Sequence, residues 1–247
     1  MPSTWNEQRL VESFDVDAGG RLKPQVLFAF LTNSAWKHAA LSDVGYDGLS
    51  ARNQLWVLNK LQLVIQRMPR WGDTLHIETW GKGTDRLYAL RDYSVTFASG
   101  EALASASTAW LIIDKETRRP FRTDRLALPW VIDRSELSMD VKKVPEIPEA
   151  RERARFRAAY SDLDPNNHVT AMKYLEWIMD SHPRDFLETH RVRSVEMSFL
   201  GEATIDDAVI VSSGEGAYSD VFALKRLEDK RELCRARIAW AQAHQEG

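Results

Sequence analysis

The stretch Asp164-Pro165-Asn166-Asn167-His168-Val169 stands directly before an amphipathic run that extends to about His182. It places a carboxylate, an amide and an imidazole at alternate positions where a helix, predicted over 167–181, should begin. Because a helix N-terminus carries unpaired N–H groups and a partial positive charge, it can stabilise an oxyanion. His168 then falls on the buried face of the first turn. Asp-Pro-Asn is also ordinary cap and turn chemistry, so the stretch is either a site or a plain helix start.

Most of the remaining sequence predicts β-strands, because apolar and polar residues alternate as they do in strands with one buried face. Strands are expected over 8–16, 60–68, 74–81, 87–98, 102–114, 155–160, 192–200, 208–213, 220–227 and 232–241. A second long helix is expected over 23–41, and hairpins at Gly81-Lys82-Gly83, Ser99-Gly100 and Gly214-Glu215-Gly216. Each half of the chain therefore contains a strand, a long helix and several antiparallel strands. A proline-containing, charged segment separates the halves.

The two halves also share an internal repeat. Asp17-Ala18-Gly19-Gly20-Arg21-Leu22 aligns with residues 164–169 at an offset of 147 (164 minus 17), and the following helices align as well. Trp71-Gly72-Asp73 aligns with Ile205-Asp206-Asp207 at an offset of 134 (205 minus 71). In the first copy a glycine and an arginine replace the amide and the imidazole. The repeat predicts two similar units, with the polar chemistry confined to the second.

Composition narrows the class of protein. The 247 residues are 44% hydrophobic and 28% charged, as in globular proteins. No run of 18 apolar residues occurs, so we expect no membrane insertion. The single cysteine, Cys234, argues against a disulfide framework and, with no signal-peptide pattern at the start, predicts a cytoplasmic protein. The net charge of −3 argues against nucleic-acid binding.

The order and spacing of several fragments resemble the acyl-acyl carrier protein (acyl-ACP) thioesterases, and the missing plastid transit sequence favours the bacterial type. The fragments are Trp56-Val57-Leu58-Asn59-Lys60-Leu61, Pro69-Arg70-Trp71-Gly72-Asp73, Glu78-Thr79-Trp80, Arg91-Asp92-Tyr93, 109–111, 115–120, 163–169, Lys173-Tyr174, Trp177-Ile178 and 195–207. The resemblance implies an α+β tandem (double) hotdog, in which two antiparallel sheets each wrap around a long helix. It implies a non-catalytic hotdog with the acyl-chain pocket over 1–135, a linker over 136–152 and a catalytic hotdog over 153–247.

The resemblance also implies the catalytic residues. The family's Asp-x-Asn-x-His group corresponds to Asp164, Asn166 and His168, and its glutamate from a following strand corresponds to Glu202. Plant members carry a cysteine after this glutamate, whereas Ala203 stands here, which argues against a cysteine nucleophile. We expect Glu202 to act as general base or as nucleophile, while His168 polarises the reacting groups. Asn166 would donate to the carbonyl or the water, and Asp164 would orient Asn166.

The implied activity is hydrolysis of fatty acyl-ACP to free fatty acid, with no metal and no cofactor. Because acyl carrier protein is acidic, we expect a basic docking surface. The candidates are the alternating Arg151, Arg153, Arg155 and Arg157, or else Arg184, Arg191 and Arg193. Candidates for the lining of the acyl-chain pocket are Phe28, Leu31, Trp36, Trp56 and Leu58. A homodimer and the preferred chain length stay open.

Three alternatives use the same fold. An acyl-CoA thioesterase needs the same residues. A hotdog enoyl-thioester hydratase is disfavoured, because its Asp-x-Asn-Pro-x-His motif has one residue more between Asn and His than Asn166 and His168 have. A binding-only acyl-thioester sensor would not need the polar group. The sequence also lacks the G-x-S-x-G motif of serine hydrolases and the H-E-x-x-H motif of zinc enzymes.

Overall fold

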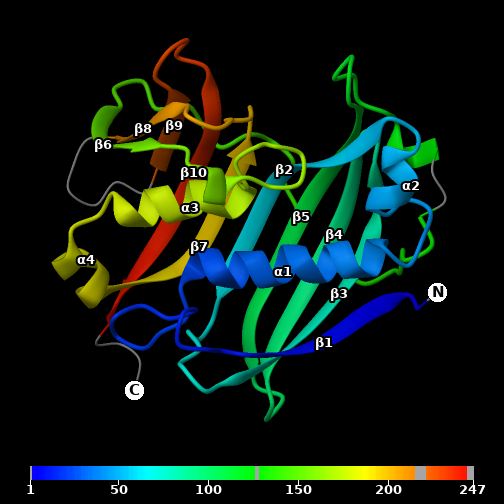
Figure 1. Cartoon of the computed structure of the whole chain (residues 1–247). Helices are drawn as coiled ribbons and strands as arrows, with labels where there is room; N and C mark the ends of the chain where they lie inside the picture. Colours follow the sequence, from blue (N-terminus) through cyan, green and yellow to red (C-terminus); the bar gives the residue numbers. More distant parts are fainter. Residues whose placement is uncertain (1, 126–127, 215–220, 244–247) are drawn as a thin grey trace. The chain divides into compact units, whose positions relative to one another are not determined.

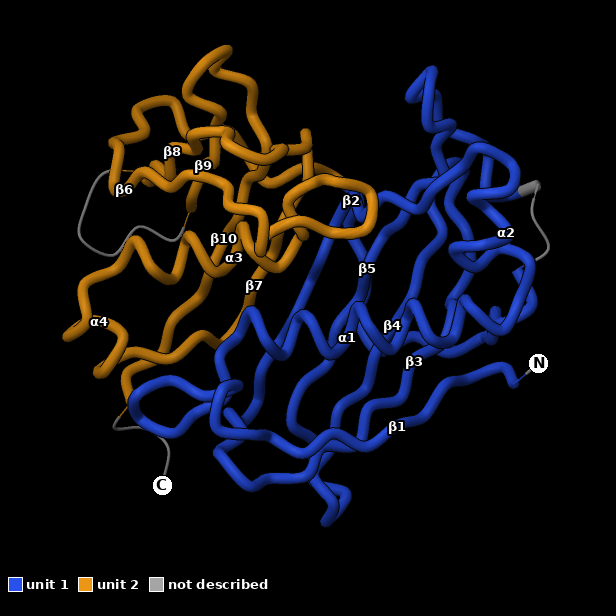
Figure 2. Tube along the Cα trace, in the orientation of Figure 1, with its two compact units in different colours: residues 1–141 blue, residues 142–247 orange. Residues whose placement is uncertain are grey.

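The computed structural model describes residues 2–125, 128–214 and 221–243. The chain divides into two compact units, residues 1–141 (unit 1) and residues 142–247 (unit 2), which Figure 2 shows in different colours. Among the described residues, no helix combines the length and the apolar character needed to cross a bilayer.

Unit 1 comprises five antiparallel strands and one long helix. Its elements are β1 (Thr4–Leu10), α1 (Pro24–Ala39), α2 (Tyr46–Ser50), β2 (Gln54–Ile65), β3 (Thr74–Asp85), β4 (Tyr88–Phe97), β5 (Ala102–Asp114) and the 3₁₀ turn η1 (Thr123–Arg125). The strands follow the order β1-β3-β4-β5-β2. Helix α1 lies against this sheet, in contact with β1 and β3 (Figure 1).

Unit 2 repeats this plan with a shorter helix. Its elements are β6 (Arg151–Arg157), the 3₁₀ turn η2 (Tyr160–Asp162), α3 (Ala171–Asp180), α4 (Arg184–Thr189), β7 (His190–Phe199), β8 (Ala208–Ser213), β9 (Val221–Arg226) and β10 (Glu232–Gln242). The strand order is β6-β8-β9-β10-β7. Counted from the first strand of each unit, both orders read 1-3-4-5-2, so the repeat predicted from sequence is confirmed in the topology.

Each long helix is fixed by its apolar face. In α1 the side chains of Leu27, Phe28 and Leu31 are fully buried, and in α3 Trp177 stacks on Phe156 of β6 with ring centroids 5.8 Å apart. Burial of such faces, rather than helix propensity, is what holds short helices in place. The predicted helix over 23–41 is thus confirmed to within two residues at each end.

One turn prediction and one strand prediction differ from the structure. Gly81-Lys82-Gly83 does not form a hairpin: it lies inside β3, where the pairing with β4 shifts register between Gly81 and Gly83. The strand expected over 8–16 is also wrong at its end, because β1 stops at Leu10. The turn at Ser99-Gly100 is confirmed, with the Gly100 N–H donating to the Phe97 carbonyl at 2.9 Å. Gly214-Glu215-Gly216 extends beyond the described residues.

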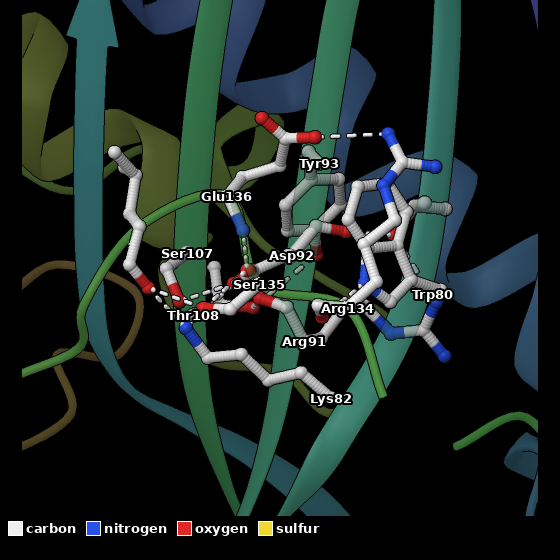
Figure 3. Close-up of polar contacts among 12 residues, drawn as sticks. Trp80, Lys82, Arg91, Asp92, Tyr93, Ser107, Thr108, Arg134, Ser135 and Glu136 are labelled. Atoms are coloured by element: carbon white, nitrogen blue, oxygen red, sulfur yellow. Dashed lines mark hydrogen bonds and ion pairs between the residues drawn. The ribbon is translucent and has the colours of Figure 1, made fainter. Parts of the chain in front are cut away.

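Residues 130–137, here called the strap, run along β3 in unit 1. The Gly81 N–H donates to the Trp130 carbonyl at 3.1 Å, and the Ile132 N–H donates back to the Gly81 carbonyl at 2.9 Å. A Cβ at Gly81 would lie 2.5 Å from Cδ1 of Trp130, so only glycine allows this approach. The Arg134 guanidinium covers the Trp80 ring at 3.8 Å (Figure 3).

A buried ion pair anchors the end of the strap. Nζ of Lys82 lies 2.9 Å from Oδ1 of Asp92, and the side chains are 8% and 0% exposed. Lys82 also donates to the Leu137 carbonyl at 2.5 Å. Asp92 further accepts hydrogen bonds from the Ser107 hydroxyl at 2.6 Å and from the Glu136 N–H at 2.7 Å (Figure 3). The charges are therefore compensated by several short contacts, as burial requires.

Candidate active site

Residues 163–169 of unit 2 form a closed turn around one carboxylate. Oδ1 of Asp164 accepts the N–H groups of Asn166 at 2.8 Å and of His168 at 3.2 Å. The Asp164 N–H donates to the His168 carbonyl at 2.8 Å. Asn167 at the tip has φ of 62°, a left-handed conformation that asparagine tolerates better than most residues. Asp164 therefore organises the backbone that carries both the amide and the imidazole.

The helix begins later than the sequence predicts. Helix α3 starts at Ala171 with Thr170 as its N-cap, so His168 precedes the helix instead of lying in its first turn. The left-handed Asn167 prevents helical geometry before that point. The Val169 N–H donates to the Ala203 carbonyl at 2.8 Å, and the Thr170 N–H donates to the Asp162 carbonyl at 2.9 Å. These two backbone donors are already used, so neither is free for a substrate oxygen.

Glu202 meets His168 across this turn. It lies between β7 and β8, and its Oε2 is 3.5 Å from Nε2 of His168, with side-chain exposures of 30% and 25%. Nδ2 of Asn166 lies 3.4 Å from Oδ2 of Asp164. The four residues singled out in the sequence are thus brought together in unit 2. The carboxylate and the imidazole are both partly exposed.

Two further side chains hold the peptide group that joins Glu202 to Ala203. Nη2 of Arg226 donates to the Glu202 carbonyl at 2.7 Å. The Ala203 N–H donates to the Tyr174 hydroxyl at 3.0 Å. Burial raises the pKa of Tyr174, so its hydroxyl stays protonated. Sequence reasoning missed both residues, because Tyr174 fits the apolar face of a helix and Arg226 ends an ordinary strand.

Unit 1 contains the same turn without the acid and base. Oδ1 of Asp17 accepts the N–H groups of Gly19 at 2.8 Å and of Arg21 at 3.0 Å, and Gly20 at the tip has φ of 72°. The imidazole is replaced by the Arg21 guanidinium, which pairs with Asp17 at 3.0 Å. With the offset of 134, Met68 stands where Glu202 stands. The backbone of the turn is therefore repeated in unit 1, but the imidazole and the carboxylate of unit 2 are not.

Unit 1 instead has an open, largely apolar pocket. Its walls come from α1, three strands and the strap: Ala35, Trp36, Ala39, Trp56, Ala89, Leu90, Arg91, Trp110 and Trp130. Of the five predicted lining residues, Trp36 and Trp56 line this pocket. Phe28 and Leu31 are fully buried core residues, and Leu58 is buried outside the lining.

Three of the seven arginines of the predicted basic surfaces, Arg155, Arg157 and Arg184, pair with neighbouring carboxylates. The alternation along β6 is interrupted by a register shift between Glu152 and Ala154. Nε of Arg155 lies 2.6 Å from Oε1 of Glu152, and Nη2 of Arg157 lies 3.0 Å from Oδ1 of Asp206. Exposed pairs of this kind reduce the local field that a carrier protein would meet.

Comparison with known proteins places these features in one family. The model of the acyl-ACP thioesterase N-terminal domain matches residues 2–125, and that of the C-terminal domain matches residues 146–242. An acyl-[acyl-carrier-protein] hydrolase of Cuphea viscosissima is 28% identical over 93% of this chain and 61% of its own length. A palmitoyl-acyl carrier protein thioesterase of Cuphea hookeriana is 27% identical over 93% and 60%. The chain spans about three fifths of the length of these relatives.

Two solved structures superpose on 97% of this chain. An acyl-ACP thioesterase from Bacteroides thetaiotaomicron superposes with a TM-score of 0.86 and 26% identity, covering 97% of this chain and 98% of the other. The 12:0-ACP thioesterase from Umbellularia californica gives a TM-score of 0.82 at 21% identity, with coverage of 97% and 98%, which shows a common fold.

Proposed function

This chain belongs to the acyl-ACP thioesterase family, and on that premise we propose that it hydrolyses the thioester of a fatty acyl chain carried by acyl carrier protein. The observation that carries this proposal is the Glu202–His168 pair, 3.5 Å apart, in which His168 belongs to the turn that Asp164 organises. No comparable acid–base pair occupies the matching turn of unit 1, where Arg21 and Met68 stand.

In the proposed reaction Glu202 acts as general base. Its carboxylate takes a proton from water, the water oxygen attacks the carbonyl carbon, and the C–S bond breaks. The thiolate of the carrier leaves and takes up the proton, so the products are a free fatty acid and the carrier thiol. Nδ2 of Asn166 and Nε2 of His168 are the side-chain donors for the developing oxyanion, since the turn's backbone donors are occupied.

Three substitutions test the site. We expect Glu202→Gln, His168→Ala and Asn166→Ala each to lower kcat about 100-fold or more, because each removes a group used in the transition state. The midpoint of thermal unfolding should change little, since these side chains are partly exposed. Full activity of Glu202→Gln would remove Glu202 from the mechanism. A covalently acylated protein, seen by mass spectrometry after an acid quench, would make Glu202 the nucleophile instead of the base.

The two units have different roles in the proposed enzyme. We propose a tandem hotdog in which residues 1–135 hold the acyl chain, residues 136–152 connect the units and residues 153–247 carry the catalytic residues. Support comes from the shared 1-3-4-5-2 strand order, the apolar pocket in unit 1 and the acid–base pair in unit 2. The protein would act in the cytoplasm on a carrier-bound substrate, as a monomer or a homodimer.

The carrier must be distinguished from coenzyme A. Rates of thiol release should be compared for the same acyl group on acyl carrier protein and on coenzyme A. We expect kcat/KM to be at least about tenfold higher for the protein-bound substrate, because docking adds binding energy to the same chemistry. A higher value for the coenzyme A thioester would reassign the protein as an acyl-CoA thioesterase. Hydration of a trans-2-enoyl thioester without thiol release would point to a hydratase.

A further inference from the structure

A cation lines the apolar pocket of unit 1. Arg91 of β4 is 6% exposed, and its guanidinium lies 5.4 Å from the centroid of the Trp130 ring. Nη1 of Arg91 approaches Nδ1 of His38 at 3.1 Å and donates to the Thr79 hydroxyl at 3.2 Å. Nε2 of His38 lies 3.0 Å from the Pro2 carbonyl and must donate to it, which leaves Nδ1 as an acceptor. Both known partners of the guanidinium are therefore neutral.

The charge of Arg91 lacks a carboxylate partner among the described residues. The adjacent Asp92 is paired with Lys82. An arginine has five N–H donors, and only those on Nη1 have partners in the part of the chain that the structure describes. Burial lowers the pKa of Arg91, and no carboxylate opposes this effect. A buried cation without a carboxylate partner is costly.

We propose that this pocket binds an alkyl chain bearing an oxygen acceptor, which receives hydrogen bonds from the free N–H groups of the Arg91 guanidinium. The tryptophan walls contact the alkyl part, and the guanidinium contacts the oxygen. Two sources supply this chemistry: the carboxylate of a free fatty acid, or a keto or hydroxyl oxygen on the acyl chain of the substrate. The inference rests on the proposed function in that it takes the pocket as the acyl-chain site.

The first test is a binding series at constant chain length. Decanoate, 1-decanol and decylammonium are titrated into the protein while tryptophan fluorescence is recorded, since four tryptophans line the pocket. We expect decanoate to bind at least about tenfold more tightly than 1-decanol, and decylammonium to bind most weakly. Equal affinities for the three ligands would overturn the proposal, whether or not any variant folds.

Two variants test whether the ligands bind in the pocket of unit 1 and contact Arg91. Arg91→Met keeps the apolar length of the side chain and should abolish the preference for decanoate. Ala35→Leu fills the pocket and should weaken the binding of all three ligands. A preference for decanoate that survives in Arg91→Met would contradict the assignment.

The second test separates the two sources. The values of kcat/KM are compared for a decanoyl thioester and for the same thioester with a keto group on its chain. A higher value for the keto substrate, lost in Arg91→Met, identifies an oxygenated substrate. Tight binding of decanoate without a preference for the keto substrate identifies the free fatty acid as the ligand of Arg91. If no thioester is hydrolysed but decanoate still binds through Arg91, the proposed function fails and the ligand site remains.

A second inference concerns the peptide group between Glu202 and Ala203, whose two polar atoms are both held by side chains. Arg226 is 19% exposed; its Nε lies 3.2 Å from Oδ2 of Asp207 as an ion pair without hydrogen-bond alignment. Its Nη2 contacts the Glu202 carbonyl at 2.7 Å. Tyr174, which is 3% exposed, accepts the Ala203 N–H. The next carbonyl, that of Ala203, accepts the N–H of Val169, directly after His168.

Unit 1 provides an internal comparison for this arrangement. At the offsets of 147 and 134, Leu27 corresponds to Tyr174 and Pro69 to Ala203. In the sheet, Arg226 pairs with Val209 as Phe97 pairs with Leu75, so Phe97 corresponds to Arg226. The Pro69 carbonyl still accepts the Leu22 N–H at 2.9 Å, as the Ala203 carbonyl accepts that of Val169. The turn therefore forms without the tyrosine and the arginine.

We infer that Tyr174 and Arg226 are positioning residues that direct the Glu202 carboxylate toward His168. Tyr174→Phe and Arg226→Gln should each lower kcat about tenfold while KM stays within about twofold, because the substrate's binding contacts are unchanged. Arg226→Lys should restore part of the rate. Tyr93→Phe, which removes another buried tyrosine hydroxyl in unit 1, is the matched control and should keep full activity.

A double-mutant cycle separates positioning from stability. In the Glu202→Ala background, Tyr174→Phe should cause no further loss of residual activity, because the carboxylate it directs is gone. A further tenfold loss in that background, or a full rate for Tyr174→Phe alone, would contradict the inference. If Glu202→Ala is itself fully active, the assignment of Glu202 as the base fails, whereas absence of thioester hydrolysis in the wild-type chain would mean that the proposed function fails, so the failures are distinguishable.

Discussion

At the scale of single residues, the two aspartates that organise the repeated turns offer a matched test. Asp164 and Asp17 each accept two backbone N–H groups in their own turn. We expect Asp164→Ala and Asp17→Ala each to lower the unfolding free energy by about 1–2 kcal/mol, because each leaves similar donors without an acceptor. Urea unfolding measures this loss.

Only one of these substitutions should affect catalysis. Asp164→Ala should also lower kcat, since it releases the backbone that carries Asn166 and His168, whereas Asp17→Ala should leave kcat unchanged. Equal losses of kcat in both variants would mean that the effect comes from stability and not from the site.

The sequence pattern predicted part of the candidate active site in unit 2. The polar residues at alternate positions in 164–168 identified the right turn, because side-chain type and spacing are written in the sequence. They also led to the wrong helix start, since nothing local shows that Asn167 adopts a left-handed conformation. Tyr174 and Arg226 could not be found in this way. Their partners are main-chain atoms at positions 203 and 202, and such contacts depend on the tertiary fold.

At the scale of elements, the strap depends on the buried pair of Lys82 and Asp92. We expect Lys82→Met to lower the unfolding free energy of unit 1 by about 3–5 kcal/mol, because it leaves the Asp92 carboxylate buried without its cation. Arg67→Gln is the control: it breaks the exposed pair with Glu101 and should cost at most about 1 kcal/mol in the same urea titration. Similar losses in both variants would mean that burial of the pair is unimportant.

A histidine between α3 and α4 gives unit 2 an acid-sensitive contact. His182 is 8% exposed, stacks on Phe186 at 4.9 Å and approaches the Ile178 carbonyl with Nδ1 at 2.9 Å. Burial lowers the pKa of His182 below its usual 6.5, and the charge of Arg153 adds to this. As pH falls, the unfolded chain therefore binds a proton before the folded chain does, so the unfolding free energy decreases below about pH 6.5.

The slope of that decrease is the measurable quantity. It should reach at most about 1.4 kcal/mol per pH unit for this histidine. His182→Phe should reduce the slope between about pH 7 and pH 5. It should not abolish it, because burial also lowers the pKa of His38 in unit 1. Identical slopes for the wild-type chain and the variant would exclude His182 as a source of acid sensitivity.

At the scale of the whole molecule, unit 1 contains the apolar pocket and unit 2 contains the Glu202–His168 pair. We expect Trp110→Leu, which removes an indole from the pocket lining, to raise kcat/KM for longer acyl chains relative to shorter ones. A butyryl thioester should keep its rate within about twofold. Thiol release over a series of chain lengths measures both effects. A uniform loss for all chains would contradict a pocket that contacts only the acyl chain.

The fold was more predictable than the pocket. Strand alternation, glycine turns and the two offsets predicted the repeated order of elements, because these features are periodic in the sequence. The pocket lining was predicted poorly: Trp36 and Trp56 line it, but Phe28 and Leu31 are buried core residues. Large apolar residues serve both roles, and only the packed structure separates them.

Pro69, which lies between β2 and β3 and accepts the Leu22 N–H of the turn of unit 1, has a consequence for protein engineering. A second hydrolytic centre cannot be built there by restoring only the amide, imidazole and carboxylate at positions 19, 21 and 68. Pro69 has no N–H to offer, so a tyrosine at position 27 would find no donor, and the peptide before it would lack its anchor. The residues that hold the peptide group, at positions 27 and 69, would have to be replaced before the amide, imidazole and carboxylate are introduced.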